Sequence, residues 1–512
     1  MLLIFHIKST LLIVALISLS VTQAKADIKE QQVWDELRAF VTSAGFEISS
    51  TEARVGNTIQ VRDLMLSKKF GQTTDSLSGF LRLSIPALRF AQTDHKTVAI
   101  TLPEMMQMQM LITAPDGKKS DLQIEYHHKI NKMTVEEKSQ NLVYTYAAET
   151  AQIDLLKLII KGINLSGLGL TAALDLTNIT ASSSLVDDIN RRFVQTLALD
   201  TFSYGADMIM PDTTLNLSGT VKDLGFAGEA RLPITGDDPD AVPLGASTAR
   251  FNGNWHYGTA NLDFTSKEAG KSGQYASKSS TTVSSLALAE NQLSYTMTST
   301  EAAVSLEHAD LPFPIALELA RLSTHMTVPL TADTTPKAYA LRLDLSEFAI
   351  ADELWSVFDP NTILPRDPAS LTVDLSGSAK VLVDFFTSGG NTTLKTDVGL
   401  PVEVQDVALQ QFNLSAAGTK VTSVGQFQFD NSDLFTVEGI PRPEGQLEIE
   451  INGAYDLMDR LIEMGLIQKS EAMGLRMMLS MLTVPGPAED ALKTLIEVTK
   501  EGHIIANGQR LR

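Results

Sequence analysis

The segment 371–385 is the strongest constraint on what this chain can fold into. Its odd positions are apolar except for Gly377, and its even positions are polar except for Leu382. Because side chains of a strand alternate between two faces, the segment predicts one long strand with an apolar and a polar face. At roughly 3.3 Å per residue it would be about 50 Å long, whereas a typical strand is about 17–20 Å. We therefore expect an extended, curved sheet.

Shorter alternating runs occur along most of the chain, and the connections between them are too short for helical crossovers. The neighbouring strands should therefore be antiparallel. The sequence predicts a mainly β fold with minor α structure: an elongated curved antiparallel sheet, which could be a groove, a folded sheet or an open barrel. Alternating runs are found at 81–85, 106–112, 122–126, 283–288, 293–297, 339–345 and 447–451.

Helical spacing of apolar residues appears at both ends of the chain. Residues 28–44 are predicted to form an N-terminal amphipathic helix that ends at Gly45. Near the C-terminus, 457–463 and 471–482 are predicted to form a helical hairpin that lies on the sheet. Two further helices are expected at 185–197, where apolar residues are four apart, and at 352–358.

Glycine-containing segments mark the expected turns and bends. A hairpin is expected over 48–65 around Gly56, a strand pair at 251–257 and 262–264, and a loop at 266–280. A Leu-Ser-Gly step recurs in 163–167, 215–219 and 373–377 without a fixed period. We expect its glycine to permit a bend or bulge in a long strand.

These patterns define an expected domain organisation. Residues 1–26 have a lysine-containing start, an apolar run at 11–21 and a small-x-small site at 24–26, as in a secretory signal peptide. A β body would follow at 27–454, with a possible boundary near 266–280. A helical hairpin at 455–486 and a terminal β-hairpin at 487–512 complete the chain.

The signal-like start predicts export, in a bacterium to the periplasm, with cleavage after Ala24 or Ala26; an uncleaved anchor is the alternative. The apolar run is too short to span a bilayer, and no later segment is long enough. The net charge of −20 disfavours nucleic-acid binding. The absence of cysteine excludes disulfides, thiolate metal sites and cysteine nucleophiles.

Motifs of known chemistry are missing or weak. The eight histidines are mostly scattered, and the pair His127–His128 would point to opposite faces of a strand, which disfavours metal chelation. The segment 269–272 resembles the end of a phosphate-binding loop but has Thr265 where the first glycine belongs. An acidic stretch at 236–240 lacks the spaced ligands of a calcium loop. We therefore expect no enzymatic activity, no metal and no cofactor.

Methionine is concentrated in two windows, 105–110 and 458–481, which together hold ten of the 17 methionines. Flexible, polarisable side chains suit surfaces that bind variable apolar partners, so these windows are candidate ligand-binding sites. The alternative is that both windows belong to the core, with those in the second window seating the helical hairpin on the sheet. The candidate residues are Met106, Met108, Met110, Met473, Met477, Met478 and Met481.

Six segments of the C-terminal half are similar to those of a known family: Leu-Pro-Phe-Pro at 311–314, 354–368, 371–377, Phe-Gln-Phe-Asp at 427–430, Met-Gly-Leu-Arg-Met-Met at 473–478 and 505–511. Through them the chain resembles an uncharacterised bacterial family, domain of unknown function 2125 (DUF2125). That family has no established activity or catalytic residues, so the resemblance implies none here. Its strand-rich exported chains are similar in architecture to elongated β-groove proteins of the bacterial envelope, such as the AsmA group.

The sequence therefore leads to one main functional hypothesis and two alternatives. The main hypothesis is a non-catalytic exported envelope protein that binds a lipid, another hydrophobic ligand or an envelope protein partner on an apolar sheet face. The first alternative is a purely structural scaffold whose apolar face is closed on itself, and an enzyme is the weakest alternative. Whether the apolar face is filled by the chain's own side chains or left open distinguishes the first two.

Overall fold

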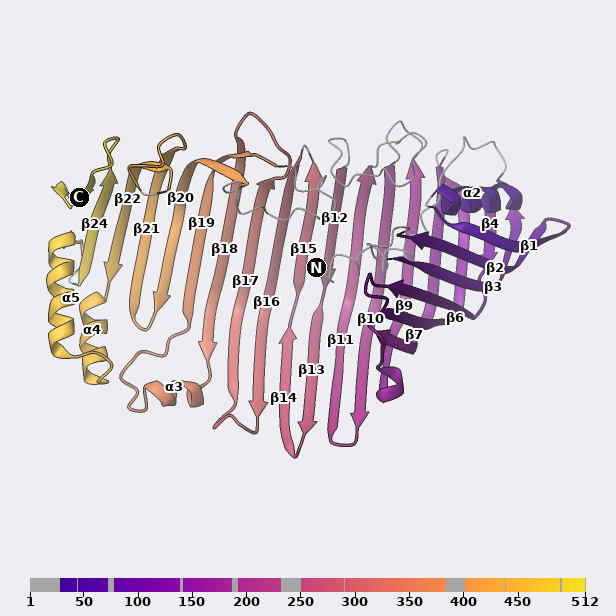
Figure 1. Ribbon diagram of the computed structural model, residues 1–512, viewed down its shortest axis with the longest axis horizontal. Helices are drawn as coiled ribbons and strands as arrows, with labels where there is room; N and C mark the ends of the chain where they lie inside the picture. Colours follow the sequence, from indigo (N-terminus) through magenta and orange to yellow (C-terminus); the bar gives the residue numbers. More distant parts are fainter. Residues whose placement is uncertain are drawn as a thin grey trace. The chain divides into compact units, whose positions relative to one another are not determined.

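A computed structural model provides the fold of the chain (Figure 1). It divides into two compact units, the first comprising Met1–Val242 and Thr248–Ala276 and the second Pro243–Ser247 and Ser277–Arg512. The residues that the structure describes are 28–43, 45–71, 78–138, 141–186, 192–231, 250–289, 291–383, 401–437, 439–488 and 490–511.

The first unit combines one α-helix with long antiparallel strands. Two of its strands are 20 residues long, about four times the length of an average strand. Its elements are α2 (Glu30–Ser43), β1 (Glu47–Val55), β2 (Thr58–Phe70), β3 (Ser78–Asp94), β4 (Thr97–Thr101), β5 (Met105–Thr113), β6 (Lys119–Lys138), β7 (Asn141–Ile160), β8 (Ile163–Asn164), the 3-10 turn η1 (Ser166–Leu168), β9 (Leu170–Val186), β10 (Arg192–Met210), β11 (Thr213–Arg231), β12 (Arg250–Tyr257) and β13 (Thr259–Glu268). The strand β14 (Lys271–Ser279) crosses the division between the units.

Strands of the first unit pair mainly with their neighbours in sequence, and at two places a pair of shorter consecutive strands lies along one long strand. β4 and β5 lie in line, because β4 pairs with one end of β3 and β5 with its other end. β12 and β13 are likewise consecutive segments along β11, broken at Gly258, which faces the side chain of Asp223. Asp223 has a positive φ, so both strands deviate from regular geometry at the same point.

The hydrophobic core of the first unit forms where α2 covers the early strands. Val33, Trp34 and Leu37 of the helix pack into a buried cluster with side chains from β2, β3, β4, β6, β7, β9 and β10. Trp34 is 1% exposed, and its ring lies 5.6 Å from that of Phe90. Among the described residues, this large buried cluster belongs entirely to the first unit.

The second unit is an antiparallel sheet with helices at its margins (Figure 1). Successive strands pair from β15 to β22, and β22 then pairs with β24. Its elements are β15 (Thr282–Ala289), β16 (Gln292–His308), β17 (Ile315–Pro329), β18 (Lys337–Ile350), α3 (Asp352–Phe358), β19 (Ala369–Val381), β20 (Val402–Ala416), β21 (Thr419–Asp430), β22 (Arg442–Asn452), α4 (Ala454–Glu463), α5 (Lys469–Leu482), β23 (Val484–Pro485), β24 (Ala491–Val498), β25 (Ile504–Ala506) and β26 (Gln509–Arg510).

The predicted fold class is confirmed. The chain is mainly antiparallel β structure with an N-terminal helix, and α4 and α5 form the expected C-terminal hairpin. The hairpin around Gly56 is present, with Gly56 at a φ of 58°. The strand predicted over 371–385 is present as β19, which ends at Val381. Residues 384 and 385 lie outside the described residues.

Three local predictions were wrong. Residues 192–197 belong to β10 and 185–186 to β9, so the helix expected at 185–197 is absent from the described part of that range. The segment 271–279 is the strand β14, although a loop was expected over 266–280. The segments 251–257 and 262–264 do not pair with each other, because both lie along β11.

Candidate functional site

One face of the second unit's sheet is built mainly from apolar side chains. Cross-strand register aligns them into three rows, each crossing eight strands from β16 to β24. We call these 24 positions the apolar face. The rows are Tyr295, Met326, Leu341, Leu375, Leu409, Gly425, Leu447 and Ile496; Met297, Thr324, Leu343, Val373, Phe412, Ser423, Ile449 and Thr494; and Ser299, Leu322, Leu345, Leu371, Leu414, Val421, Ile451 and Leu492.

The apolar face has no charged side chain and few free hydrogen-bonding groups. Of its hydroxyl groups, that of Ser423 donates to the Glu448 carbonyl oxygen at 2.8 Å, and that of Ser299 accepts from the Thr282 hydroxyl at 2.8 Å. The buried hydroxyl of Thr324, in the middle row, has no hydrogen-bond partner among the described residues. The face therefore offers a ligand mainly apolar contact, with few polar groups.

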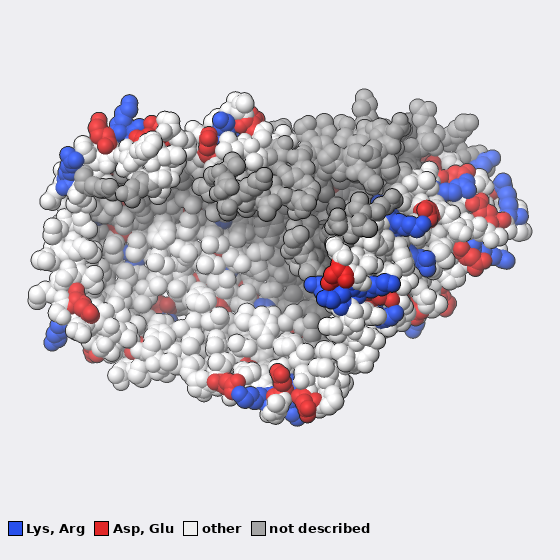
Figure 2. Space-filling model, in the orientation of Figure 1, with Lys and Arg blue, Asp and Glu red and all other residues white. Residues whose placement is uncertain are grey.

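The apolar face is also incompletely covered. Most of its side chains are half-buried, and Leu341 is 45% exposed. Among the described residues, the helices lie at the margins: α3 adjoins the end of β17, and α4 and α5 lie beside the last strands (Figure 1). Figure 2 shows a hollowed surface over these strands with few charged residues. Among the described residues, the helical hairpin therefore lies beside the sheet and does not cover β19.

The opposite face of the same sheet is polar. Arg342 of β18 pairs with Asp344 on its own strand and with Asp374 on β19, each at 2.8 Å. Burial works to raise the pKa of Asp344, but the hydrogen bonds from Arg342 and Thr372 and the charge of Arg342 together outweigh it and lower the pKa. Lys493 and Glu448 form a further cross-strand pair at 2.6 Å. The sheet is therefore amphipathic, and its apolar side is the face that the described residues leave incompletely covered.

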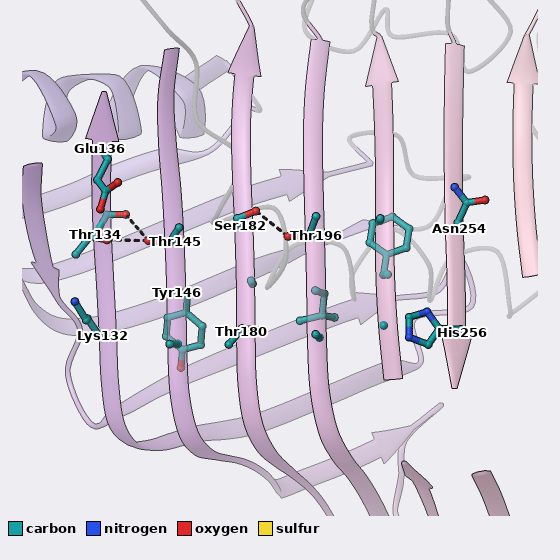
Figure 3. Close-up of a pocket in the computed structure, with 17 residues that line it drawn as sticks. Lys132, Thr134, Glu136, Thr145, Tyr146, Thr180, Ser182, Thr196, Asn254 and His256 are labelled. Carbon is teal, nitrogen blue, oxygen red and sulfur yellow. Dashed lines mark hydrogen bonds between the residues drawn. The ribbon is translucent and has the colours of Figure 1, made fainter. Parts of the chain in front are cut away.

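A second candidate site is a partly open cleft of about 680 Å³ in the first unit (Figure 3). Its floor includes a row of hydroxyl groups that runs across neighbouring strands. Thr134 and Thr145 are bonded at 2.7 Å, and Ser182 and Thr196 at 2.7 Å. Because these hydroxyls bond one another, the cleft presents a partly self-satisfied polar surface.

Small and charged residues form the rest of the cleft. A parallel row passes through Ala147, Thr180, Ala198 and Gly225, with Lys132 at one end and His256 at the other. The imidazole of His256 lies over Gly225, where an added Cβ would be 2.3 Å from the ring. The cleft can accept a polar ligand. Among its titratable side chains, Tyr146 is already hydrogen-bonded, to the Tyr126 hydroxyl at 2.7 Å and to Nδ1 of the buried His128 at 3.0 Å.

A comparison with protein families identifies the region that contains the apolar face. A family model described as an uncharacterized protein conserved in bacteria (DUF2125) matches residues 238–500, just over half of the chain. The chain belongs to the DUF2125 family. No curated protein matches it. The DUF2125 region includes β15 to β24 with the helical hairpin, so all three apolar rows lie within it.

The methionine candidates are divided between the two units. Met106 and Met108 of β5, in the first unit, are half-buried and pack against its core, and Met110 is also half-buried. Met473, Met477, Met478 and Met481, in the DUF2125 region, are all exposed on α5. The alternative in which the second window seats the hairpin on the sheet is therefore wrong, whereas Met106 and Met108 do contact the core.

Sequence analysis selected methionines and missed most of the apolar face. Alternation in 339–345 and 371–385 did place Leu341 and Leu375 on apolar faces, but the register that joins them across β18 and β19 is not visible in a single strand. The described residues contain no group of His, Asp and Glu side chains suited to hold a metal ion. None of the described helices is both long and apolar enough to cross a membrane.

Proposed function

We propose that this DUF2125 protein is a non-catalytic cell-envelope protein whose second unit binds lipid acyl chains on the apolar face. The observation that carries the proposal is the set of three mainly apolar rows that no described helix covers. Exposed apolar area of this extent on a protein surface is typical of a binding site.

The size of the apolar face fits acyl chains. Strands about 4.8 Å apart make eight strands about 34 Å wide, and three rows extend about 14 Å along the strands. The hydrocarbon core of a bilayer is about 30 Å thick, so an acyl chain that extends through one leaflet is about 15 Å long. Several chains could therefore lie along the strands side by side.

The chemistry of the face favours an acyl chain over a polar ligand. A polar group placed there without partners would lose its hydrogen bonds to water, at a cost of roughly 1–3 kcal/mol. Each buried methylene would instead contribute about 0.8 kcal/mol relative to water. A bilayer gives an acyl chain the same free-energy gain relative to water. The protein would therefore exchange lipid with membranes, and detergent would remove the bound lipid.

Placement in the cell envelope rests on the sequence. The segment 1–26 resembles a secretory signal peptide, and a lipid-binding surface would meet its ligand in that compartment. Amino-terminal sequencing of the protein from the periplasmic fraction tests this part independently. A cytoplasmic protein that begins at Met1 would contradict it.

Detergent-free purification followed by native mass spectrometry and lipid extraction tests acyl-chain binding. Leu375→Arg places a charge in the apolar row that also contains Leu341 and Leu409, and we expect at least tenfold less bound lipid because an unpaired charge is costly against acyl chains. Ser376→Arg is the matched control, since it adds the same side chain at the next position of β19, on the polar face. Wild-type protein without bound lipid, or equal lipid in both variants, would contradict the proposal.

A further inference from the structure

The helix α5 has an apolar side that faces solvent. Met473, Met477 and Met481 are spaced by four residues, so they lie along one side of the helix. They are 73%, 65% and 62% exposed, and Met478 beside them is 49% exposed. A surface helix normally turns its apolar side to the core, so α5 has the reverse orientation.

Contacts with α4 fix this orientation. Arg476 of α5 forms an ion pair with Asp459 of α4, and its guanidinium lies 5.7 Å from the centre of the Tyr455 ring. Ala472 is buried on the same side of α5. Because Arg476 and Ala472 anchor one side to the rest of the hairpin, the methionine side is held away from α4.

The segments that flank α5 also expose apolar side chains. They are Leu466, in the turn before the helix, and Val484, two residues beyond its end. We call Leu466, Met473, Met477, Met478, Met481 and Val484 the α5 surface. Lys469, four residues before Met473, lies on the same side at the first residue of α5, whereas Arg476 faces α4. A lysine at the end of such a side can extend its charged end to the headgroups while its methylene stem lies along apolar surface.

We propose that the α5 surface docks the protein on a lipid bilayer by inserting its methionine side chains into the interface between headgroups and acyl chains. An amphipathic helix that lies in this interface needs an apolar side and no complementary protein surface. Unbranched, flexible methionine side chains can adapt to a fluid environment.

Size and charge favour a bilayer over a protein partner. A stable protein–protein interface contains roughly 20–30 residues on each side, whereas the α5 surface has six side chains. The chain's net charge of −20 opposes binding to anionic lipid, so the bilayer should be zwitterionic. This docking depends on α5 alone and would stand even if the apolar face bound no acyl chain.

Flotation of the full mature chain with phosphatidylcholine vesicles tests the proposal. The variant with Met473→Gln, Met477→Gln and Met481→Gln keeps side-chain length and helix propensity but loses apolar surface. We expect its vesicle-bound fraction to fall roughly tenfold or more, because apolar burial drives interfacial binding. The matched control, with Val424→Gln, Phe435→Gln and Ile440→Gln, removes three exposed apolar side chains elsewhere in the second unit and should float like wild type.

A fluorescent label gives a second measurement that does not depend on the triple variant folding. The chain has no cysteine, so Met477→Cys and Val424→Cys can each carry a single environment-sensitive NBD group. Vesicles should shift the emission of the label at 477 to shorter wavelength and leave that at 424 unchanged. The proposal is overturned by unchanged emission at 477, by a triple variant that floats like wild type, or by a wild-type dimer that the triple variant dissociates.

Discussion

Three glycines of the sheets face an aromatic ring on the neighbouring strand. Gly219 pairs with Tyr204, Gly377 with Tyr339, and Gly225 with His256. An added Cβ at any of these glycines would come within 2.7 Å of the facing ring or its hydroxyl. The missing side chain therefore makes room for a ring that covers the exposed backbone, an arrangement known to stabilise sheets.

The contact between Gly225 and His256 can be measured by a double-mutant cycle. Gly225→Ala should destabilise the first unit by about 1–3 kcal/mol, because the methyl group meets the imidazole. In a His256→Ala background Gly225→Ala should destabilise the unit much less, because the three atoms nearest to the added Cβ all belong to the His256 ring. Urea unfolding of the four proteins gives the coupling energy. Additive effects would show that the ring does not lie over Gly225.

The buried His128 predicts a pH dependence of stability. Its Nδ1 lies 3.0 Å from the Tyr146 hydroxyl and its Nε2 lies 3.1 Å from the Asn131 amide nitrogen. Burial lowers the pKa of His128 from 6.5, although the carboxylate of Glu104 acts in the opposite direction. The unfolded chain therefore binds the proton first, so stability is fully present above about pH 6.5 and is lost as pH falls below it.

Urea midpoints at pH 7.5 and 5.5 measure this effect. Wild type should lose stability between the two values, and His128→Gln should lose less because the titrating group is gone. The exposed His95→Gln serves as the control and should keep the wild-type pH dependence. If His128→Gln loses as much stability between pH 7.5 and 5.5 as wild type does, then other titratable groups cause the pH dependence.

The prediction that the glycine of the Leu-Ser-Gly step permits a bend or bulge in a strand was correct at one of its three sites. Gly167 lies in the 3-10 turn η1 and not in a strand. Gly377 directly precedes a register shift between β19 and β20 at Ser378 and Ala379, as a bulge-forming glycine would. Gly219, in contrast, lies in regular register on both sides of β11. Both glycines face a tyrosine, and that shared role depends on a residue of the adjacent strand, which the motif itself does not contain.

At the scale of elements, α2 was predictable because its apolar spacing matches a helix and Gly45 follows it at a φ of 81°. Trp34→Ala should therefore destabilise the first unit by about 3–5 kcal/mol, since it empties a fully buried site beside Phe90. Phe435→Ala, at a side chain that is 92% exposed, should change stability by less than about 0.5 kcal/mol. Calorimetry or urea unfolding measures both, and equal effects would contradict the core described for the first unit.

The false helix at 185–197 has a simple physical cause. Residues four apart lie on one side of a helix, but four is also an even number, so they lie on one face of a strand as well. Phe193 and Leu197 are on the same face of β10 for that reason. The polar β14 was missed for the opposite reason, because its strand is formed by pairing and not by an apolar pattern.

Which side of an amphipathic helix meets the protein could not be predicted for α5. Its methionine spacing is the same whether that side is buried or exposed, and the usual expectation is burial. The ion pair between Arg476 and Asp459 decides the orientation, and it joins residues 17 positions apart on two helices. Only the arrangement of the whole hairpin reveals the α5 surface.

At the scale of the whole molecule, the two units differ in how far they bury their apolar side chains. The first has a buried core, whereas the apolar face of the second is half-buried among the described residues. Bound lipid should therefore slow hydrogen exchange in β18, β19 and β20 and leave β6 and β7 unchanged, because a ligand stabilises the part that binds it. Exchange measured by mass spectrometry with and without lipid tests this, and slowing confined to the first unit would contradict it.

Alternation along single strands was enough to predict an amphipathic sheet, and therefore to predict that one of its faces is apolar. Whether the face is closed depends on where distant elements pack, which no local pattern in 371–385 specifies. The lipid-binding proposal therefore rests on the structure of the second unit more than on any motif.

The most direct test of acyl-chain binding is photo-crosslinking at two adjacent positions of β18. Leu343 belongs to the apolar face, whereas Arg342 lies on the polar face and pairs with Asp374. With the photoreactive residue p-benzoylphenylalanine introduced at either position in living cells, we predict lipid adducts at 343 and none at 342. Equal labelling at both positions, or a protein adduct at 343 in place of lipid, would contradict the account.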